Sequence, residues 1–152
     1  ANGDSFITMF PPLVLVVSST RGWSSPETIE TSKRSALLAE KGGNLPQVVI
    51  QTFGNFATTW ISGDVPKTLA LADQVIDLAR RDGSGFSLRC GHEAQFWSRW
   101  VAADLIVAEE HFKLWKEVCA ASGYGPFPGE TTSALSMGAL IAEHLGYSDL
   151  GR

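Results

Sequence analysis

Hydrophobic residues recur along the chain at the spacing of one helix face, in segments separated by small and turn-forming residues. Between residues 45 and 62, Val49, Phe53, Phe56 and Trp60 follow one another at steps of four, three and four. That spacing places them on one side of a helix. The next segment carries an equivalent stripe, formed by Leu69, Ala72, Val75, Ile76 and Ala79. Each segment is therefore expected to form a helix that buries one side.

About seven such segments are expected, and Gly and Pro fall mostly between them, where they separate one helix from the next. Ser25-Pro26 and Asp64 are typical helix starts, because a capping side chain or an early proline suits the first turn. The stretch 122–129 contains three Gly and two Pro and is expected to be a loop. The expected helices cover residues 11–21, 25–42, 45–62, 64–83, 86–102, 104–121 and 130–145.

The segments also repeat along the chain. Gly43, Gly83 and Gly123 lie forty residues apart, and Trp60 and Trp100 keep the same spacing. A fixed period of about 20–50 residues is typical of a stacked array of one small unit. The sequence therefore predicts an all-α, right-handed solenoid of antiparallel helix pairs, similar to tetratricopeptide repeats. The single domain 1–152 is expected to contain pairs at 4–43, 44–83 and 84–123 and a partial pair at 124–152.

Inside each pair, a small residue is expected at the turn, where it lets the two helices approach closely. These residues are Gly22, Gly63, Ala103 and Gly146. The last pair lacks its second helix, so one face of 130–145 is expected to be partly uncovered, which favours self-association. The chain begins without methionine. Together with the half-finished repeat, this indicates either a removed methionine or a piece of a longer protein.

Composition limits the classes of function. The 152 residues are 44% hydrophobic and 18% charged, which is typical of one folded domain with a sizeable core. The net charge is −4 and the twelve Lys and Arg form no run, so no nucleic-acid partner is expected. The apolar run 6–17 is too short and too interrupted for a membrane span. Two cysteines, Cys90 and Cys119, form no disulfide framework, and a cytoplasmic location is expected.

Three stretches carry a likeness to a known family: 19–27 (STRGWSSPE), 60–72 (WISGDVPKTLALA) and 144–149 (HLGYSD). They resemble the tetratricopeptide-like helical region of bacterial signalling proteins that also contain a class III adenylate/guanylate cyclase domain and a P-loop ATPase module. Ser148 stands where the family turn commonly has proline, and the unit of about forty residues exceeds the usual thirty-four. The resemblance implies a regulatory or scaffolding segment. No GxxxxGK[ST] nucleotide-binding loop occurs in the sequence.

Candidate metal ligands are few. Cys90 and His92 have no second ligand pair nearby in sequence, and His111 and Cys119 belong to a different expected helix. A zinc site needs about four ligands, so neither a metal nor another cofactor is expected. The simpler interpretation places His92 near a helix start and Cys90 in the core as a small hydrophobic residue.

The candidate catalytic carboxylates are Glu109 and Glu110 on one expected helix and Asp73 and Asp77 on another, where Asp73, Asp77, Arg80 and Arg81 are expected to face solvent. Asp77 and Arg81 are spaced for an ion pair at i, i+4. Acid–base catalysis needs two carboxylates that converge on one cleft. No catalytic residue is therefore expected in this segment.

The aromatic residues are the best candidates for a binding surface. Trp97 and Trp100 lie in the middle of the array with Arg99 between them, and Trp and Arg are typical of interface hot spots. Arg99 faces either outward or into a concave groove. Tyr124 and Phe127 lie in the long Gly- and Pro-rich loop, where they form either a docking surface or a cover for the core. The competing interpretation is that the tryptophans are core residues, since aromatics bury large areas.

These observations predict a non-catalytic, protein–protein interaction or regulatory scaffold module whose partner is a protein, a peptide or a neighbouring domain. One alternative is a small-ligand receptor or enzyme that uses an aromatic-rich groove. Another is a purely structural spine. An apolar or positively charged groove surface would distinguish a binding module from a spine.

If Trp100 is a core residue, Trp100→Ala is expected to lower the free energy of unfolding by about 3–5 kcal/mol, as for other buried aromatics. Chemical denaturation measures this loss. A loss below about 1 kcal/mol together with lost binding would instead assign Trp100 to a ligand surface.

Overall fold

The computed structural model describes residues 17, 20–22, 25–122, 136 and 138–146, and within these it is helical with no strand. The all-α prediction is therefore confirmed. The predicted helix 11–21 and the loop 122–129 lie almost wholly outside the described residues. The described helices are α2 (Pro26–Lys41), α3 (Leu45–Ser62), α4 (Val65–Asp82), α5 (Gly85–Val101) and α6 (Leu105–Ser122), followed by helical residues 138–144.

The junctions between helices share one two-residue design. A residue with positive φ ends one helix, and a polar residue directly after it begins the next. The positive φ angles are 65° at Gly43, 78° at Gly63, 72° at Gly83 and 61° at Ala103. These four positions are twenty residues apart, so each forty-residue period contains two helix-plus-junction units.

The polar residue of each junction caps the following helix. Side-chain oxygens of Asn44, Asp64 and Ser84 each accept a hydrogen bond from the backbone N–H three residues later, at 3.2–3.3 Å. This satisfies one of the N–H groups that a helix start leaves without an intrahelical partner. The positive-φ residue and the capping residue together explain why the predicted helix boundaries agree with the observed ones to within about one residue at most ends.

Close approach is not the reason for glycine at the turns, contrary to the sequence-based expectation. A Cβ added at Gly63 would meet no neighbouring atom within 4 Å. The positive φ itself favours glycine there, because a Cβ strains the left-handed backbone. Helices do approach closely at Gly91, in the middle of α5, where a Cβ would lie 2.6 Å from Ile76 Cδ1 and 3.0 Å from Ala79 Cβ.

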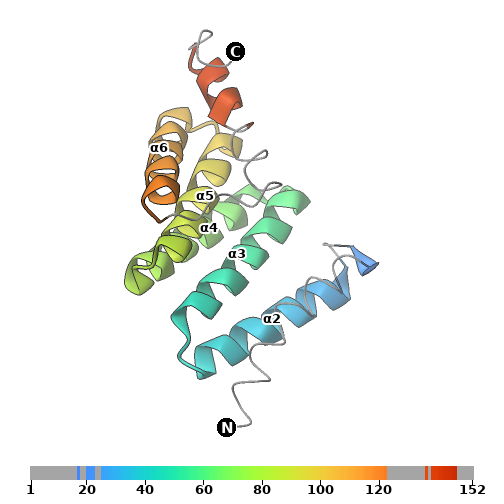
Figure 1. Cartoon of the computed structure of the whole chain (residues 1–152). Coiled ribbons are helices and arrows are strands. Elements are labelled where there is room, and N and C mark those ends of the chain that lie inside the picture. Colours follow the sequence, from blue (N-terminus) through green and yellow to red (C-terminus); the bar gives the residue numbers. More distant parts are fainter. Residues whose placement is uncertain (1–16, 18–19, 23–24, 123–135, 137, 147–152) are drawn as a thin grey trace.

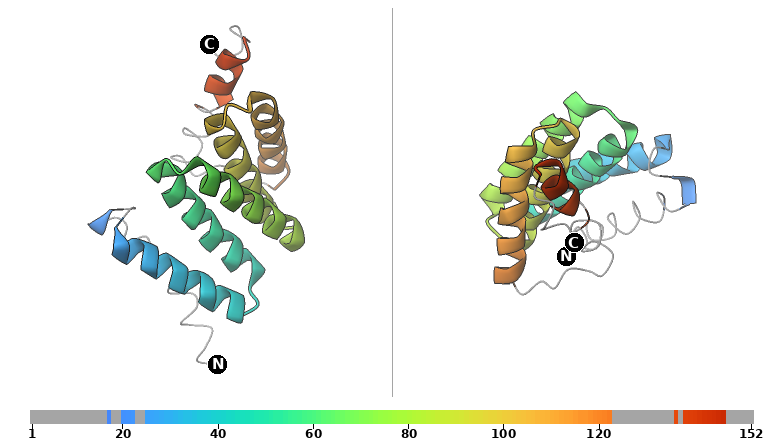
Figure 2. Two further views of the ribbon diagram at one scale, coloured as in Figure 1. Left: turned by 180° about the vertical axis from the view of Figure 1, so that it is seen from behind. Right: turned by 90° about the horizontal axis from the view of Figure 1, so that it is seen from above.

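The helices pack in chain order, each beside the one before it (Figures 1 and 2). Helix α5 packs against α4 and α6 and contacts α3, and its Phe96 also packs with Ile141 of the helical residues 138–144. Nearly every residue from 87 to 98 of α5 is buried. α5 is therefore the central helix of the described part of the chain.

Two hydrophobic clusters hold the helices together. The first joins α3, α4 and α5 and contains Val49, Phe56, Ala72, Val75, Cys90 and Ala94. The second joins α5, α6 and the helical residues 138–144 and contains Phe96, Ala108, Trp115 and Ile141. The half-buried ring of Trp97 packs against both. The predicted inner stripes of α3 and α4 supply most of the first cluster.

Ile106 of α6 is hydrophobic, yet its side chain is 74% exposed. At about 100° per residue, Ile106 lies roughly 180° around α6 from Trp115 and about 160° from Ala108. Both of those residues are buried. Hydrophobic residues therefore occur on both sides of α6, and one side faces solvent.

None of the described helices combines the length and the apolar character needed to cross a membrane. Cys90 is buried in the first cluster, and Cys119 is half-buried beside the second.

Ala103→Gly is expected to raise the free energy of unfolding by about 0.5–1 kcal/mol, because it removes the strain of a Cβ at φ 61°. Gly63→Ala is expected to lower it by about 1 kcal/mol at the equivalent junction. Chemical denaturation gives both values. Ala102→Gly is the matched control: Ala102 has φ −79°, so glycine there can only destabilise. Stabilisation by the control, or none by Ala103→Gly, would contradict the role assigned to backbone strain.

Candidate functional site

The predicted aromatic site lies against the core. The Trp97 ring meets Trp60 of α3 edge to face, with ring centroids 4.6 Å apart and an interplanar angle of 81°. Trp100 is half-buried beside the second cluster, and its ring lies 6.3 Å from that of His144. Such aromatic pairs contribute about 0.5–1.5 kcal/mol beyond their burial. Both tryptophans thus have contacts within the protein, and a partner surface at this position stays a prediction.

Arg99 takes part in a closed hydrogen-bond network between α4 and α5. Its Nη2 donates to Asp73 Oδ1 at 2.8 Å, and its Nε donates to Gln95 Oε1 at 3.1 Å. The Gln95 amide nitrogen donates to the same Asp73 oxygen at 2.8 Å. Gln95 is 2% exposed, so this network satisfies an amide that would otherwise be costly to bury. Arg99 therefore helps to fix α5 against α4.

The remaining predicted site residues, Tyr124 and Phe127, lie outside the described residues. The predicted ion pair between Asp77 and Arg81 is not the one observed. Asp77 pairs with Arg80 instead, at 3.6 Å and with both side chains exposed. Such exposed pairs contribute little to stability.

Two histidines meet between α5 and α6. Nδ1 of His92 and Nδ1 of His111 are 3.0 Å apart, a hydrogen-bond distance. One ring must donate and the other must accept, so the accepting ring is neutral, and two neutral rings form this bond only in different tautomers. His92 lies in the middle of α5 and is buried, which corrects the expectation that it lies near a helix start.

Burial lowers the pKa of His92 from 6.5 to about 4, with further lowering by the charges of His111 and Arg80. Burial likewise lowers the pKa of His111, although the nearby Glu110 and Asp73 oppose this. Both rings are therefore neutral at pH 7, and their hydrogen bond then requires different tautomers. No group of three or more His, Cys, Asp or Glu side chains suited to a metal ion occurs among the described residues.

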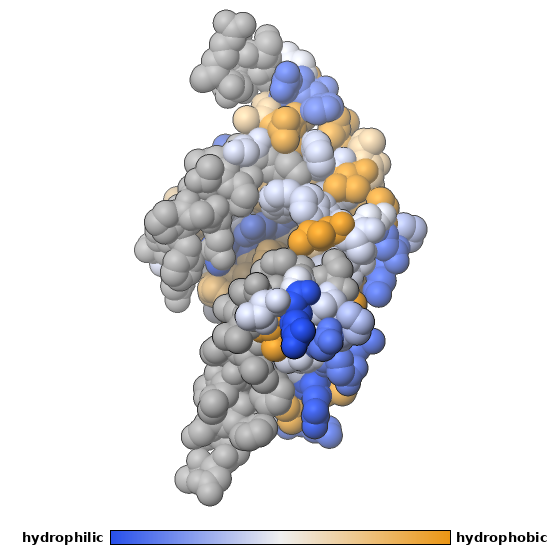
Figure 3. All heavy atoms as spheres, turned by 90° about the vertical axis from the view of Figure 1, so that its right-hand side faces the viewer, coloured by the Kyte–Doolittle hydropathy of each residue, from blue (hydrophilic) through white to orange (hydrophobic). Residues whose placement is uncertain are grey.

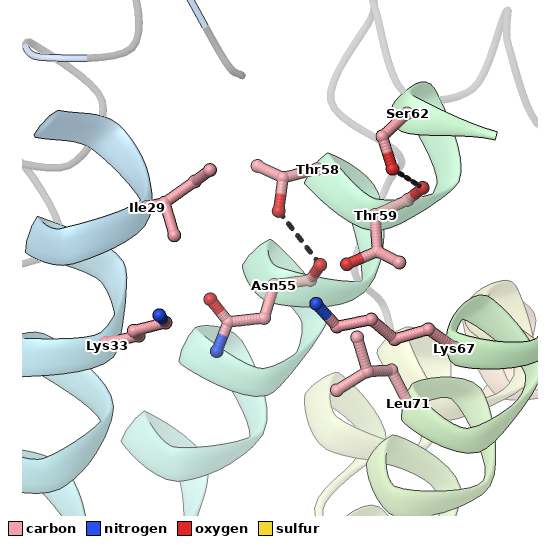
Figure 4. Close-up of a pocket in the computed structure, with 8 residues that line it drawn as sticks. All are labelled: Ile29, Lys33, Asn55, Thr58, Thr59, Ser62, Lys67 and Leu71. Carbon is pink, nitrogen blue, oxygen red and sulfur yellow. Dashed lines mark hydrogen bonds between the residues drawn. The ribbon is translucent and has the colours of Figure 1, made fainter. Parts of the chain in front are cut away.

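A hollow of about 300 Å³ lies where α2, α3 and α4 face one another (Figure 4). Its floor is a stripe of α3, and its sides come from α2 and α4. The stripe arises because residues three and four apart share a helix face. The lining residues are Ile29 and Lys33 of α2, Asn55, Thr58, Thr59 and Ser62 of α3, and Lys67 and Leu71 of α4.

Two cationic side chains extend into this hollow from opposite sides. Figure 4 shows Lys33 and Lys67 both reaching toward Asn55. Thr58 and Ser62 donate their hydroxyl hydrogens to backbone carbonyls of α3, at 2.9 and 2.6 Å. Within the described part of the chain, the Asn55 amide makes no hydrogen bond and neither lysine has an ion-pair partner. The hollow therefore presents these donor groups to solvent beside a lining surface that is mostly apolar.

The described residues visible in Figure 3 form no single continuous apolar patch. Hydrophobic residues occur there in small groups between hydrophilic ones. The lysine-lined hollow is consequently a more specific surface feature than any apolar region visible in that view.

The sequence-based interpretation missed both the histidine pair and the hollow. A signal for the pair existed, because His92 and His111 lie ten residues before and nine residues after Ala102. Residues at such distances from a short turn meet when two helices fold back on each other. The hollow depends on three helices at once and has no comparable signal.

Comparison of the chain with protein-family models, with curated proteins and with solved structures finds no match.

The histidine pair predicts that stability falls in acid. The unfolded chain binds protons on His92 near pH 6.5 and the folded chain only near about 4, so the free energy of unfolding decreases as pH falls through that window. The difference corresponds to roughly 3 kcal/mol, at 1.36 kcal/mol per pKa unit. Urea unfolding at pH 7, 6, 5 and 4.5 measures this loss.

His92→Gln is expected to flatten this pH dependence, since glutamine does not titrate. His111→Gln provides a second variant in case the first folds poorly. An unchanged slope in both variants would show that other groups cause the acid sensitivity.

Proposed function

We propose that this chain is a non-catalytic interaction module, a right-handed solenoid of antiparallel helix pairs similar to tetratricopeptide repeats. The observation that carries the proposal is the hollow across α2, α3 and α4, which has a lysine on two of its sides. A positively charged groove is the feature expected of a binding module and not of a structural spine. Stacked helix pairs present surfaces of this kind to extended segments of a partner.

At two junctions, a residue before the junction contacts a residue after it, and these contacts support the pairing of helices. Asp73 and Gln95 lie eleven residues before and after Ser84, and their side chains are hydrogen-bonded. His92 and His111 are related in the same way about Ala102. Such contacts are typical of helices that reverse direction at a short turn, and the twenty-residue spacing of the junctions supports their repetition.

The resemblance to helical regions of bacterial cyclase- or ATPase-type signalling proteins leads us to place the module in a regulatory, cytoplasmic context. Its role there is to hold a partner protein or a neighbouring domain. The alternative, an enzyme or small-ligand receptor, needs an open aromatic pocket beside paired carboxylates. Trp97 and Trp100 are half-buried and pack against the hydrophobic clusters instead, which favours the interaction module.

Peptide binding is the test of this function. A random library of short immobilised peptides, half of them with phosphoserine at one position, is expected to yield binders with dissociation constants on the order of micromolar. Hydrogen exchange is expected to show protection on at least two successive helices. A panel of metabolites screened in parallel is expected to give no binder of similar affinity. Tight metabolite binding without any selected peptide would overturn the interaction-module proposal.

A further inference from the structure

Four donor groups converge on the hollow without a protein partner among the described residues. They are the ammonium groups of Lys33 and Lys67, the amide of Asn55 and the hydroxyl of Thr59. They come from three helices: Thr59 is buried and Asn55 is half-buried, whereas the two lysine side chains are exposed. A buried or half-buried donor gains free energy when an acceptor reaches it. The arrangement is thus suited to a ligand rich in acceptor atoms.

The charge of the hollow is opposite to that of the chain as a whole. Two of the eight lining residues are cationic and none is acidic, whereas the chain carries a net charge of −4. The carboxylate of Asp64, which accepts a hydrogen bond from the backbone N–H of Lys67, does not line the hollow. The local positive charge is therefore a property of this site and selects an anion.

The number of charges distinguishes between anions. A carboxylate carries one negative charge, but a phosphate monoester carries about 1.5 to 2 and has three strong acceptor oxygens. Two lysines on opposite sides, with an amide and a hydroxyl between them, match the larger charge and the larger number of acceptors. Lysine binds phosphate as a point charge and needs no planar bidentate geometry.

The remaining walls indicate what carries the phosphate. Ile29 and Leu71 line the hollow beside the polar groups, and Ile29 is 39% exposed. Inorganic phosphate would leave these apolar side chains without contact. A free metabolite is usually bound with about 70–90% of its surface buried, and a rim this exposed does not enclose one. A side chain that belongs to a longer segment gains further contacts outside the hollow.

We propose that the hollow between α2, α3 and α4 binds a phosphorylated serine or threonine side chain of a partner peptide. Lys33 and Lys67 contact the phosphate oxygens from either side, Asn55 and Thr59 donate to them from the floor, and Ile29 and Leu71 contact apolar residues that flank the phosphorylated position. The inference rests on the proposed interaction function and names the chemistry of its partner.

The test uses acetylated, amidated peptide pools with randomised flanks around one fixed central residue: phosphoserine, serine or glutamate. Fluorescence anisotropy measures the affinity of the full chain for each pool. The phosphoserine pool is expected to bind about tenfold tighter than the serine pool, with the glutamate pool between them. In NMR spectra, the side-chain amide of Asn55 is expected to shift on binding.

Lys33→Gln and Lys67→Gln are each expected to weaken binding of the phosphoserine pool about tenfold, in line with the loss of one charge-assisted hydrogen bond. Lys41→Gln is the matched control, because it removes one positive charge from the end of α2 outside the hollow. It is expected to change the affinity less than about twofold. Circular dichroism melting curves check that each variant keeps its fold.

Different failures have different meanings. Equal binding of the phosphoserine and serine pools, or equal loss in Lys41→Gln, overturns the phosphate site and leaves the interaction module standing. Free O-phosphoserine or inorganic phosphate that binds as tightly as the peptide pool shows a metabolite site and overturns the peptide partner. If the protein binds none of the pools and no member of the library, both proposals are overturned.

Discussion

The structure depends on a two-residue helix junction that recurs every twenty residues. One residue in the left-handed region ends a helix, and the polar residue that follows caps the next one, as at Gly63-Asp64 and Gly83-Ser84. The first residue bends the chain without loss of helix on either side, and the second satisfies the orphaned N–H groups of the new helix. The twenty-residue spacing of the junctions determines where each helix ends and where the next one begins. The core then needs only an apolar stripe on each helix.

Helix α5 is where polar and apolar packing combine. On one part of its surface Gly91 lets α4 approach closely, and on others Gln95 and His92 form hydrogen bonds to α4 and α6. These polar contacts are specific in geometry, whereas hydrophobic contacts alone tolerate small shifts between helices. The register of α5 against its two neighbours is therefore fixed by hydrogen bonds, and its depth of burial by the two hydrophobic clusters.

Helix boundaries and inner faces could be predicted from the sequence because both are encoded locally. Gly63, Asp64 and Pro66 mark a boundary by themselves, and the steps between Val49, Phe56 and Trp60 define one face. The contact of Arg99 with Asp73 could not be predicted in this way. It joins residues twenty-six positions apart and depends on how two helices lie against each other.

Two other misses have local causes. Glycine occurs at the turns because of the positive φ there and not because the helices approach closely. The sequence alone does not distinguish these two explanations. The exposed Ile106 shows that hydrophobic character does not by itself assign a residue to the buried side of a helix.

The lysine-lined hollow needs side chains from α2, α3 and α4 together, so no single segment of sequence contains its signal.

Packing mainly between consecutive helices also determines how the protein can form. Two adjacent helices meet after closure of a chain segment of only about twenty to forty residues, which costs little loop entropy and favours rapid folding. Among the described helices, α5 contacts three others, whereas α2 has its main contacts with α3 alone. A folding nucleus around α5 forms the most inter-helix contacts for each chain segment that must be closed. Order then spreads outward helix by helix, and α2 is the first of these helices to open when the protein fluctuates.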